Sequence, residues 1–244
     1  MKKIVLIFLL FSAALAQADD GVYQISSTCA NFGCFPGDAS GYPITISSPG
    51  SYVLTSNLVS GLENTNIIRI TSNNVTIDMN GFSIIGPRTC TGFGVSIALG
   101  CDHPGMTADG ISAPNSVHSI VIKNGMIKGM DSGIAILGGV DNSNMVINVI
   151  AEENEEGILI ASGIIKDSQA NRNALRGFGS TQTGNRNGHL TITDSAAFGN
   201  GVYSAVATVC SNVFFKENGI NSTSGDEKCA YYTNGSVCKE TACL

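Results

Sequence analysis

A short motif, a glycine followed by an aliphatic or aromatic residue, recurs along the middle of the chain. Five glycines carry it: Gly110, Gly133, Gly157, Gly177 and Gly201. Their intervals are 23, 24, 20 and 24 residues. A second series of short apolar runs, from "VTID" at 75–78 to "NVFF" at 212–215, has a similar mean period. A recurrence of 20 to 50 residues is typical of a unit stacked many times.

Each repeat contains two or three short runs rich in Ile and Val, separated by Gly, Asn, Asp and Ser. Such runs are too short for helices, and the period leaves no room for a helix between successive strands. If each repeat is one turn of a coil, equivalent strands pair in parallel about 4.8 Å apart over one continuous aliphatic core. The repeat therefore predicts an all-β fold, a right-handed parallel β-helix (solenoid) of about seven or eight coils. A leucine-rich repeat is disfavoured because its L-x-x-L-x-L pattern is missing.

Three asparagines, Asn154, Asn173 and Asn200, lie one to four residues before successive glycine motifs. Asparagine tolerates the left-handed conformation that a tight bend requires. We expect these residues to form a ladder in which each amide binds the asparagine of the next coil.

The two ends of the chain differ from its middle. Residues 1–18 combine two lysines, an apolar run and a final Ala-Gln-Ala, which is typical of a cleaved secretory signal peptide. We expect an N-terminal cap over 19–43, the β-helix over 44–215 and a Cys-rich C-terminal cap over 216–244. No transmembrane segment is predicted, because no apolar run is long enough. The expected location is secreted, periplasmic or at the cell surface.

The charge balance argues against a nucleic-acid partner. Removing the leader takes two of the 13 basic residues and none of the 19 acidic ones, which leaves a net charge of −8. A chain this acidic would be repelled by phosphates.

Eight cysteines lie outside the leader. They are Cys29, Cys34, Cys90, Cys101, Cys210, Cys229, Cys238 and Cys243. An even number in an exported chain predicts disulfides, with the sequence-near pairs Cys29–Cys34 and Cys90–Cys101 as the simplest pairing. A zinc site is the alternative, but no C-x-x-C pair occurs.

The stretch "NIIRITSNNVTIDMNGFSIIGP", preceded by "ISSPGSYVLTSNL" and followed by "IKNGMIKGMDSGIAIL", carries a family resemblance. It resembles the right-handed parallel β-helix repeat proteins of the pectin-lyase-like superfamily, especially an exported bacterial group. The resemblance spans roughly residues 43–219. It implies the fold but no particular reaction, because this fold carries pectate lyases, polygalacturonases, alginate lyases, uronan epimerases and adhesins.

The superfamily's catalytic motifs do not transfer to this chain. The N-T-D, G-H-G and R-I-K strings of polygalacturonase-like enzymes are absent. No acidic cluster matches the calcium site of pectate-lyase-like enzymes, so no catalytic residue is assigned. No metal or other cofactor is predicted, and calcium would be required only if the protein were a lyase.

Strand parity predicts a candidate binding column. If Ile77, Ile122, Ile147, Ile165 and Ile192 point inward, the residues after them point outward. These outward residues are Asp78, Lys123, Asn148, Lys166 and Thr193. Lys123 and Lys166, two coils apart, would engage the carboxylates of an acidic polysaccharide. The alternative is an ordinary solvated surface.

Asp167 and Asp194 begin matching Asp-Ser pairs and form the closest predicted pair of carboxylates. One coil apart, they suit two-carboxylate chemistry or a bound cation. The alternative is that each is the first residue of a turn and accepts backbone N–H groups.

The sequence therefore indicates a secreted β-helix protein that recognises an extracellular or cell-surface polysaccharide. One alternative is a lyase or epimerase acting on a uronate glycan. Another is a structural or adhesive module of the cell envelope, which would need no binding groove.

Overall fold

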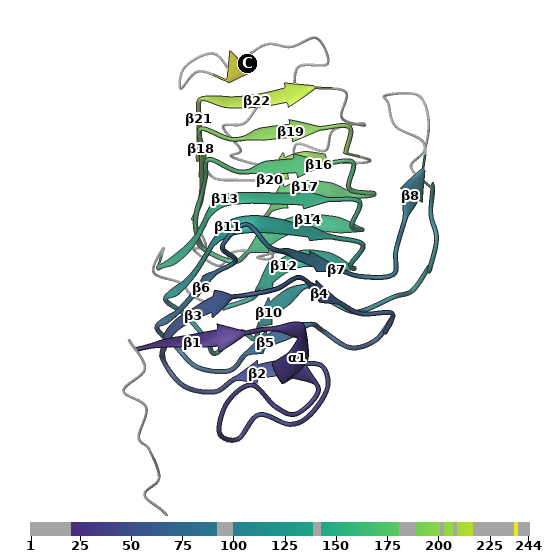
Figure 1. The fold of residues 1–244 in the computed structure, drawn as a ribbon. Coiled ribbons are helices and arrows are strands. Elements are labelled where there is room, and N and C mark those ends of the chain that lie inside the picture. Colours follow the sequence, from purple (N-terminus) through teal and green to yellow (C-terminus); the bar gives the residue numbers. More distant parts are fainter. Residues whose placement is uncertain are drawn as a thin grey trace, which may run out of the picture.

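The computed structural model describes residues 21–91, 100–138, 143–180, 189–200, 203–206, 209–216 and 237–238. Within these residues the protein is all-β, apart from the four-residue helix α1 (Ser27–Ala30). The strands stack in two long parallel sheets, between which the chain alternates (Figure 1).

The larger sheet contains 14 strands, which pair in the order β1-β3-β6-β11-β13-β16-β19-β22-β23, with β4, β7, β15, β18 and β21 beside this path. We call it sheet A. All its pairs are parallel except β22 with β23. Its strands are β1 (Val22–Ile25), β3 (Gly50–Leu54), β4 (Leu58–Val59), β6 (Val75–Asp78), β7 (Ser83–Ile85), β11 (Ile120–Lys128), β13 (Asn144–Glu152), β15 (Gly163–Lys166), β16 (Gln169–Asn171), β18 (Leu190–Thr193), β19 (Ala196–Phe198), β21 (Val209–Ser211), β22 (Val213–Lys216) and β23 (Val237–Cys238).

The second sheet, sheet B, contains seven strands, all paired in parallel. In spatial order they are β2 (Ile44–Ile46), β5 (Ile68–Ile70), β10 (Ile111–Ala113), β12 (Ser132–Ile136), β14 (Glu156–Ile160), β17 (Arg176–Gly179) and β20 (Tyr203–Val206). A small antiparallel hairpin of β8 (Cys90–Thr91) and β9 (Gly100–Cys101) leaves the stack at its side (Figure 1).

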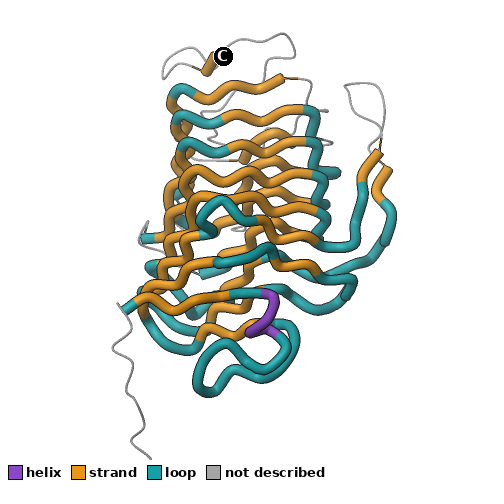
Figure 2. The backbone as a smooth tube through the Cα atoms, in the orientation of Figure 1, coloured by secondary structure: helices purple, strands orange, loops and turns teal. Residues whose placement is uncertain are grey.

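Strand pairing explains the sequence period. Ile122 of β11 pairs with Val146 of β13, which pairs with Ile165 of β15, which pairs with Ile192 of β18. The chain thus returns to the same sheet after about two dozen residues, and each return adds one strand to the stack (Figure 2).

The core runs along the inside of the stack. Ile77, Ile122, Ile165 and Ile192 are fully buried, as parity predicts. The expectation for Ile147 was wrong: Val146 is buried in its place, while Ile147 is half-buried and pairs with Lys123 and Lys166. The strand in β13 begins one residue earlier than the apolar run "MVIN" suggests, so its parity shifts by one.

The recurring glycines lie directly over one another. A Cβ on Gly110 would come within 2.6 Å of the Gly133 carbonyl oxygen, one on Gly133 within 2.7 Å of the Gly157 oxygen, and one on Gly157 within 2.3 Å of the Gly177 oxygen. Any side chain there would strike the backbone of the next strand, which explains the repeat. Gly201 lies outside the described residues; since Tyr203 pairs with Arg176, position 204 lies beside Gly177.

The asparagine ladder is confirmed. Asn154 Nδ2 donates to Asn173 Oδ1 at 3.1 Å, and Asn173 Nδ2 donates to Asn200 Oδ1 at 2.9 Å. All three residues are buried. The left-handed conformation, however, falls on the residue before each one, at Glu153, Arg172 and Gly199. The asparagines are thereby turned inward, toward the backbone that they hydrogen-bond.

The N-terminal end of the stack is closed by β1 and by the Cys29–Cys34 disulfide beside α1. Tyr23 of β1 stacks on Tyr52 at 5.1 Å between ring centroids and covers the end of the core. The predicted leader and nearly all of the predicted C-terminal cap lie outside the described residues.

Candidate functional site

The predicted outward column is only partly assembled. Asp78 and Lys123 lie on paired strands, and Lys123 Nζ is 3.1 Å from Asp78 Oδ2. The pKa of Asp78 is lowered, because hydrogen bonds from the Asn80 backbone and the Asn124 side chain and the nearby Lys123 charge outweigh burial, which raises it. The charge of Lys123 is thus already neutralised within the chain.

Asn148 does not lie between the two lysines. Ile147 occupies that place, paired with Lys123 on one side and Lys166 on the other. Thr193 continues the column beside Lys166. Asn148 instead lies at a left-handed bend inside β13, with φ of 53°, where its Nδ2 donates to Asn124 Oδ1 at 3.0 Å. The predicted polar face is therefore interrupted by an apolar side chain.

Asp167 and Asp194 follow the paired residues Lys166 and Thr193, so they lie one strand apart as predicted. Both adopt the left-handed conformation, with φ of 50° and 48°. Both are exposed, and Asp194 Oδ1 accepts a hydrogen bond from Asn212 Nδ2 at 2.8 Å. This arrangement agrees with the interpretation of the two aspartates as turn residues.

The outward face of sheet B carries a cation without a carboxylate partner. Arg69 lies between the buried residues Ile68 and Ile70 and is exposed. Its strand neighbours are Thr45 and Ser112, so Arg69 stands in a row between two residues that carry hydroxyl groups. No ion pair involves Arg69 in the described part of the chain.

Asn66 connects this row to Asp109, which is half-buried. Its Nδ2 donates to Ser112 Oγ at 2.6 Å, and its Oδ1 accepts from the backbone N–H of Asp109 at 2.8 Å. Ser132, on the next strand of sheet B, hydrogen-bonds the Asp109 carboxyl through its side chain and its backbone. Asp109 is therefore held in place by groups from both sides.

Two further charged residues, Glu156 and Arg176, lie in register with Ser132 on the next two strands of sheet B. Glu156 pairs with Ser132 on one side and with Arg176 on the other. Arg176 Nη2 lies 2.6 Å from Glu156 Oε1. A Cβ on Gly179 would lie 3.7 Å from the Arg176 guanidinium, so the arginine extends along the outward face of sheet B. We call Arg69, Ser112, Asp109, Ser132, Glu156 and Arg176 the sheet B face.

Burial raises the pKa of Asp109 to about 6, and the nearby charge of Asp131 adds to this effect, while hydrogen bonds from Ser132 oppose it. Burial also raises the pKa of Asp131, opposed by Arg88 and reinforced by Glu156. A buried carboxyl that is partly protonated near neutral pH is a frequent feature of functional sites.

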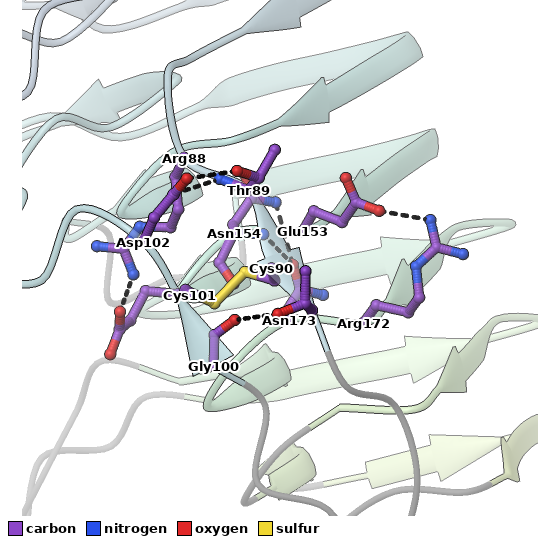
Figure 3. Close-up of a disulfide and its surroundings, with 12 residues drawn as sticks. Arg88, Thr89, Cys90, Gly100, Cys101, Asp102, Glu153, Asn154, Arg172 and Asn173 are labelled. Carbon is purple, nitrogen blue, oxygen red and sulfur yellow. Dashed lines mark hydrogen bonds and ion pairs between the residues drawn. A yellow bond between two sulfur atoms is a disulfide. The ribbon is translucent and has the colours of Figure 1, made fainter.

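A buried arginine borders this face. The Arg88 side chain is 1% exposed, contacts Glu155 Oε2 and lies 3.7 Å from Asp131 Oδ1. It belongs to the segment that leaves the stack after β7, close to the Cys90–Cys101 disulfide (Figure 3). Asp131 and Glu155 precede neighbouring strands of sheet B, so Arg88 joins two successive turns.

Sequence reasoning missed most of this face, although a signal was present. Asp109, Ser132, Glu156 and Arg176 each immediately precede one of the recurring glycines, so they share a column. Arg69 is a charged residue at outward parity in "IIRIT". The contact of Arg88 with Glu155 had no such signal, because the two residues are 67 positions apart.

Among the described residues, no group of three or more His, Cys, Asp and Glu side chains is placed to hold a metal ion. The same residues include no helix long and apolar enough to span a membrane.

Comparison of the chain with protein-family models, with curated proteins and with solved structures found no match.

Proposed function

We propose that this protein is an exported right-handed parallel β-helix that binds an extracellular or cell-surface polysaccharide on the sheet B face. Parallel pairing at a regular period supports the architecture, and right-handed crossovers are the rule for parallel strands. The disulfides Cys29–Cys34 and Cys90–Cys101 accord with an oxidising compartment outside the cytoplasm.

The observation that carries the binding proposal is the row of Thr45, Arg69 and Ser112. It presents a guanidinium between two hydroxyls, on strands about 4.8 Å apart. Arginine recognises carboxylates through two parallel hydrogen bonds, and hydroxyl groups bind sugar hydroxyls in either direction. Because Arg69 has no acidic partner in the described chain, its guanidinium is available to a ligand, and a uronate-bearing glycan supplies the matching carboxylate.

Binding of pectate and alginate oligosaccharides, measured by calorimetry at low salt, tests this proposal. We expect Arg69→Ala to weaken binding by about tenfold or more, because a charge-assisted bidentate contact is lost. Lys123→Ala is the matched control on sheet A, and it should leave binding unchanged since that lysine already pairs with Asp78.

Equal binding by the native protein and Arg69→Ala would refute the assignment to this row. Loss of binding in Lys123→Ala but not in Arg69→Ala would show that the ligand binds the outward residues of sheet A instead.

A second function, acid–base chemistry on a bound uronate as in a lyase or epimerase, is favoured by Asp109. Its backbone N–H is joined through Asn66 to Ser112 of the Arg69 row, and burial raises the pKa of its carboxyl to about 6. A general acid or base works best with a pKa near the working pH. Unsaturated or epimerised product in the same incubations, abolished in Asp109→Asn, would establish this activity.

A further inference from the structure

One segment of the chain lies outside the strand period and packs against the turns that lead from sheet A into strands β12 and β14 of sheet B. It leaves the stack after β7 and returns at β10, and its described parts are residues 86–91 and 100–109. We call these parts the strap. The Cys90–Cys101 disulfide joins its two arms. Thr89 and Asp102 join them again, since the Thr89 backbone N–H donates to Asp102 Oδ1 at 2.6 Å.

The first arm of the strap is anchored by its backbone and by Arg88. Gly86 N–H donates to the Lys128 carbonyl at 2.8 Å, and Arg88 N–H donates to the Gly129 carbonyl at 3.0 Å. The Arg88 guanidinium then contacts Glu155 and Asp131, and its Nη2 donates to the His103 carbonyl at 3.3 Å. Figure 3 shows this arm lying against the asparagine ladder, where Cys90 Sγ is 3.9 Å from the Asn154 carbonyl oxygen.

The second arm is anchored by its contacts with Glu63, which involve His103 and two backbone N–H groups. His103 Nδ1 lies 2.8 Å from Glu63 Oε1, and His103 Nε2 lies 4.0 Å from Asp102 Oδ1. The backbone N–H groups of Thr107 and Ala108 both donate to the Glu63 carbonyl. Met106 and Ala108 are buried, so this arm also closes over part of the core.

The closed strap concentrates negative charge. Four carboxyls lie near the strap, at the starts of sheet B strands or just before them: Asp109, Asp131, Glu155 and Glu156. Among the described residues two guanidiniums pair with them: Arg88 with Asp131 and Glu155, and Arg176 with Glu156. Two negative charges therefore remain uncompensated when all four carboxyls are ionised, and burial makes their repulsion more costly than it is in water.

We propose that the strap is a pH-dependent cover. It packs against the turns that lead into sheet B more tightly at mildly acidic pH than at neutral or alkaline pH. Opening the strap would hydrate Asp109 and Asp131 and separate Arg88 from both turns. The strap borders the sheet B face, so under the proposed function it would regulate access to that face, although its closure does not depend on a ligand.

The sign of the effect follows from where protons bind. Asp109 has a pKa of about 6 in the closed state, against 3.8 for an exposed aspartate, so the closed state binds more protons between these values. Asp102 keeps its charge in this range, because hydrogen bonds from Thr89 lower its pKa. At still lower pH, protonation of the carboxylates that hold Arg88 removes its partners and weakens the closure.

Hydrogen–deuterium exchange of the whole protein without ligand tests the cover. After correction for the intrinsic pH dependence of exchange, we expect amides of the strap, including those of Arg88, Thr107 and Ala108, to be about tenfold better protected at about pH 5 than at about pH 7.5. Amides of β13 serve as the internal reference and should not change. Asp109→Asn, which removes a carboxyl that pairs with no arginine among the described residues, should give the protected pattern at both pH values.

Glu153→Gln is the matched control, because Glu153 pairs with Arg172 outside the cluster. It should retain the pH dependence of the native protein. Strap protection that is independent of pH, or lower at about pH 5, would overturn the proposal. Because no glycan is present, this result is separate from success or failure of the binding experiment.

Discussion

At the residue scale, the most unusual group is the Asp109 carboxyl. It is held by Ser132 and by the Asn66 contact to its backbone, yet no arginine or lysine pairs with it among the described residues. Burial of such a carboxyl opposes its ionisation and therefore reduces the stability of the fold at neutral pH.

Replacing this carboxyl by an amide should stabilise the protein at neutral pH. The folded-state pKa of about 6 exceeds the ordinary 3.8, so ionised Asp109 destabilises the fold above about pH 6, and the effect disappears below about pH 3.8. Asp109→Asn should raise the free energy of unfolding at about pH 7.5 by up to about 3 kcal/mol. Urea denaturation at about pH 7.5 and at about pH 3.5 measures the two values.

Asp167→Asn provides the control, since this aspartate is exposed in a turn. It should change the free energy of unfolding by no more than about 0.5 kcal/mol at either pH. An Asp109→Asn variant that is less stable than the native protein at neutral pH would contradict the assigned direction.

At the element scale, the buried asparagine ladder connects the turns between sheets A and B. The Asn173 side chain makes four of these hydrogen bonds. Its Oδ1 accepts from the backbone N–H and from Nδ2 of Asn154, and its Nδ2 donates to the Ala151 carbonyl and to Asn200 Oδ1. These bonds satisfy polar groups that water does not reach. The ladder therefore works as one element, in which each amide depends on those above and below it.

Asn173→Ala should be strongly destabilising. It would leave Asn154 N–H, the Ala151 carbonyl and Asn200 Oδ1 with fewer partners in a buried site, and each such loss costs about 1 to 3 kcal/mol. We expect a loss of about 3 to 5 kcal/mol in the free energy of unfolding, measured by chemical denaturation.

Asn171→Ala, two residues away on the outward side of β16, is the comparison. Within the described part of the chain, its Nδ2 donates to Gln169 Oε1 at 3.3 Å and its Oδ1 has no partner, so its replacement should cost less than about 1 kcal/mol. Equal effects of the two substitutions would show that the ladder has no special role.

At the scale of the whole molecule, most strands pair with strands about two dozen residues away in the sequence. Among the described residues, the strap is the main segment that lies outside this pairing. The strap joins residues that are distant in sequence, such as Arg88 and Glu155, and it depends on the Cys90–Cys101 bond to hold its two arms together. A crosslink of this kind stabilises a fold chiefly by restricting the unfolded chain.

Removing this crosslink should lower the stability of the whole protein. The two cysteines are 11 residues apart, and a ring of that size is worth about 2.5 to 3 kcal/mol. Cys90→Ser combined with Cys101→Ser should therefore lower the midpoint of thermal unfolding. The pair Cys29 and Cys34, only 5 residues apart, is the control, and its removal should cost less. A larger loss from the control pair would contradict this ranking.

The sequence alone determined the features that repeat at the strand period. Glycine recurs because a side chain at Gly133 or Gly157 would strike the backbone of the neighbouring strand, and asparagine recurs because Asn154 and Asn173 bind each other. Both features are local and periodic, so they are visible in one dimension. The all-β class follows from the same periodic pattern, whereas the disulfides Cys29–Cys34 and Cys90–Cys101 follow from the even number of cysteines and the short separations within each pair.

Tertiary structure alone decided the register of each strand and the location of the buried charges. A shift of one residue placed Ile147, not Asn148, between Lys123 and Lys166, because pairing with both neighbouring strands determines parity. The contact of Arg88 with Asp131 and Glu155 depends on a segment that leaves the period and folds back. The pKa of Asp109 likewise depends on burial and on charges brought together by the fold, which no short stretch of sequence encodes.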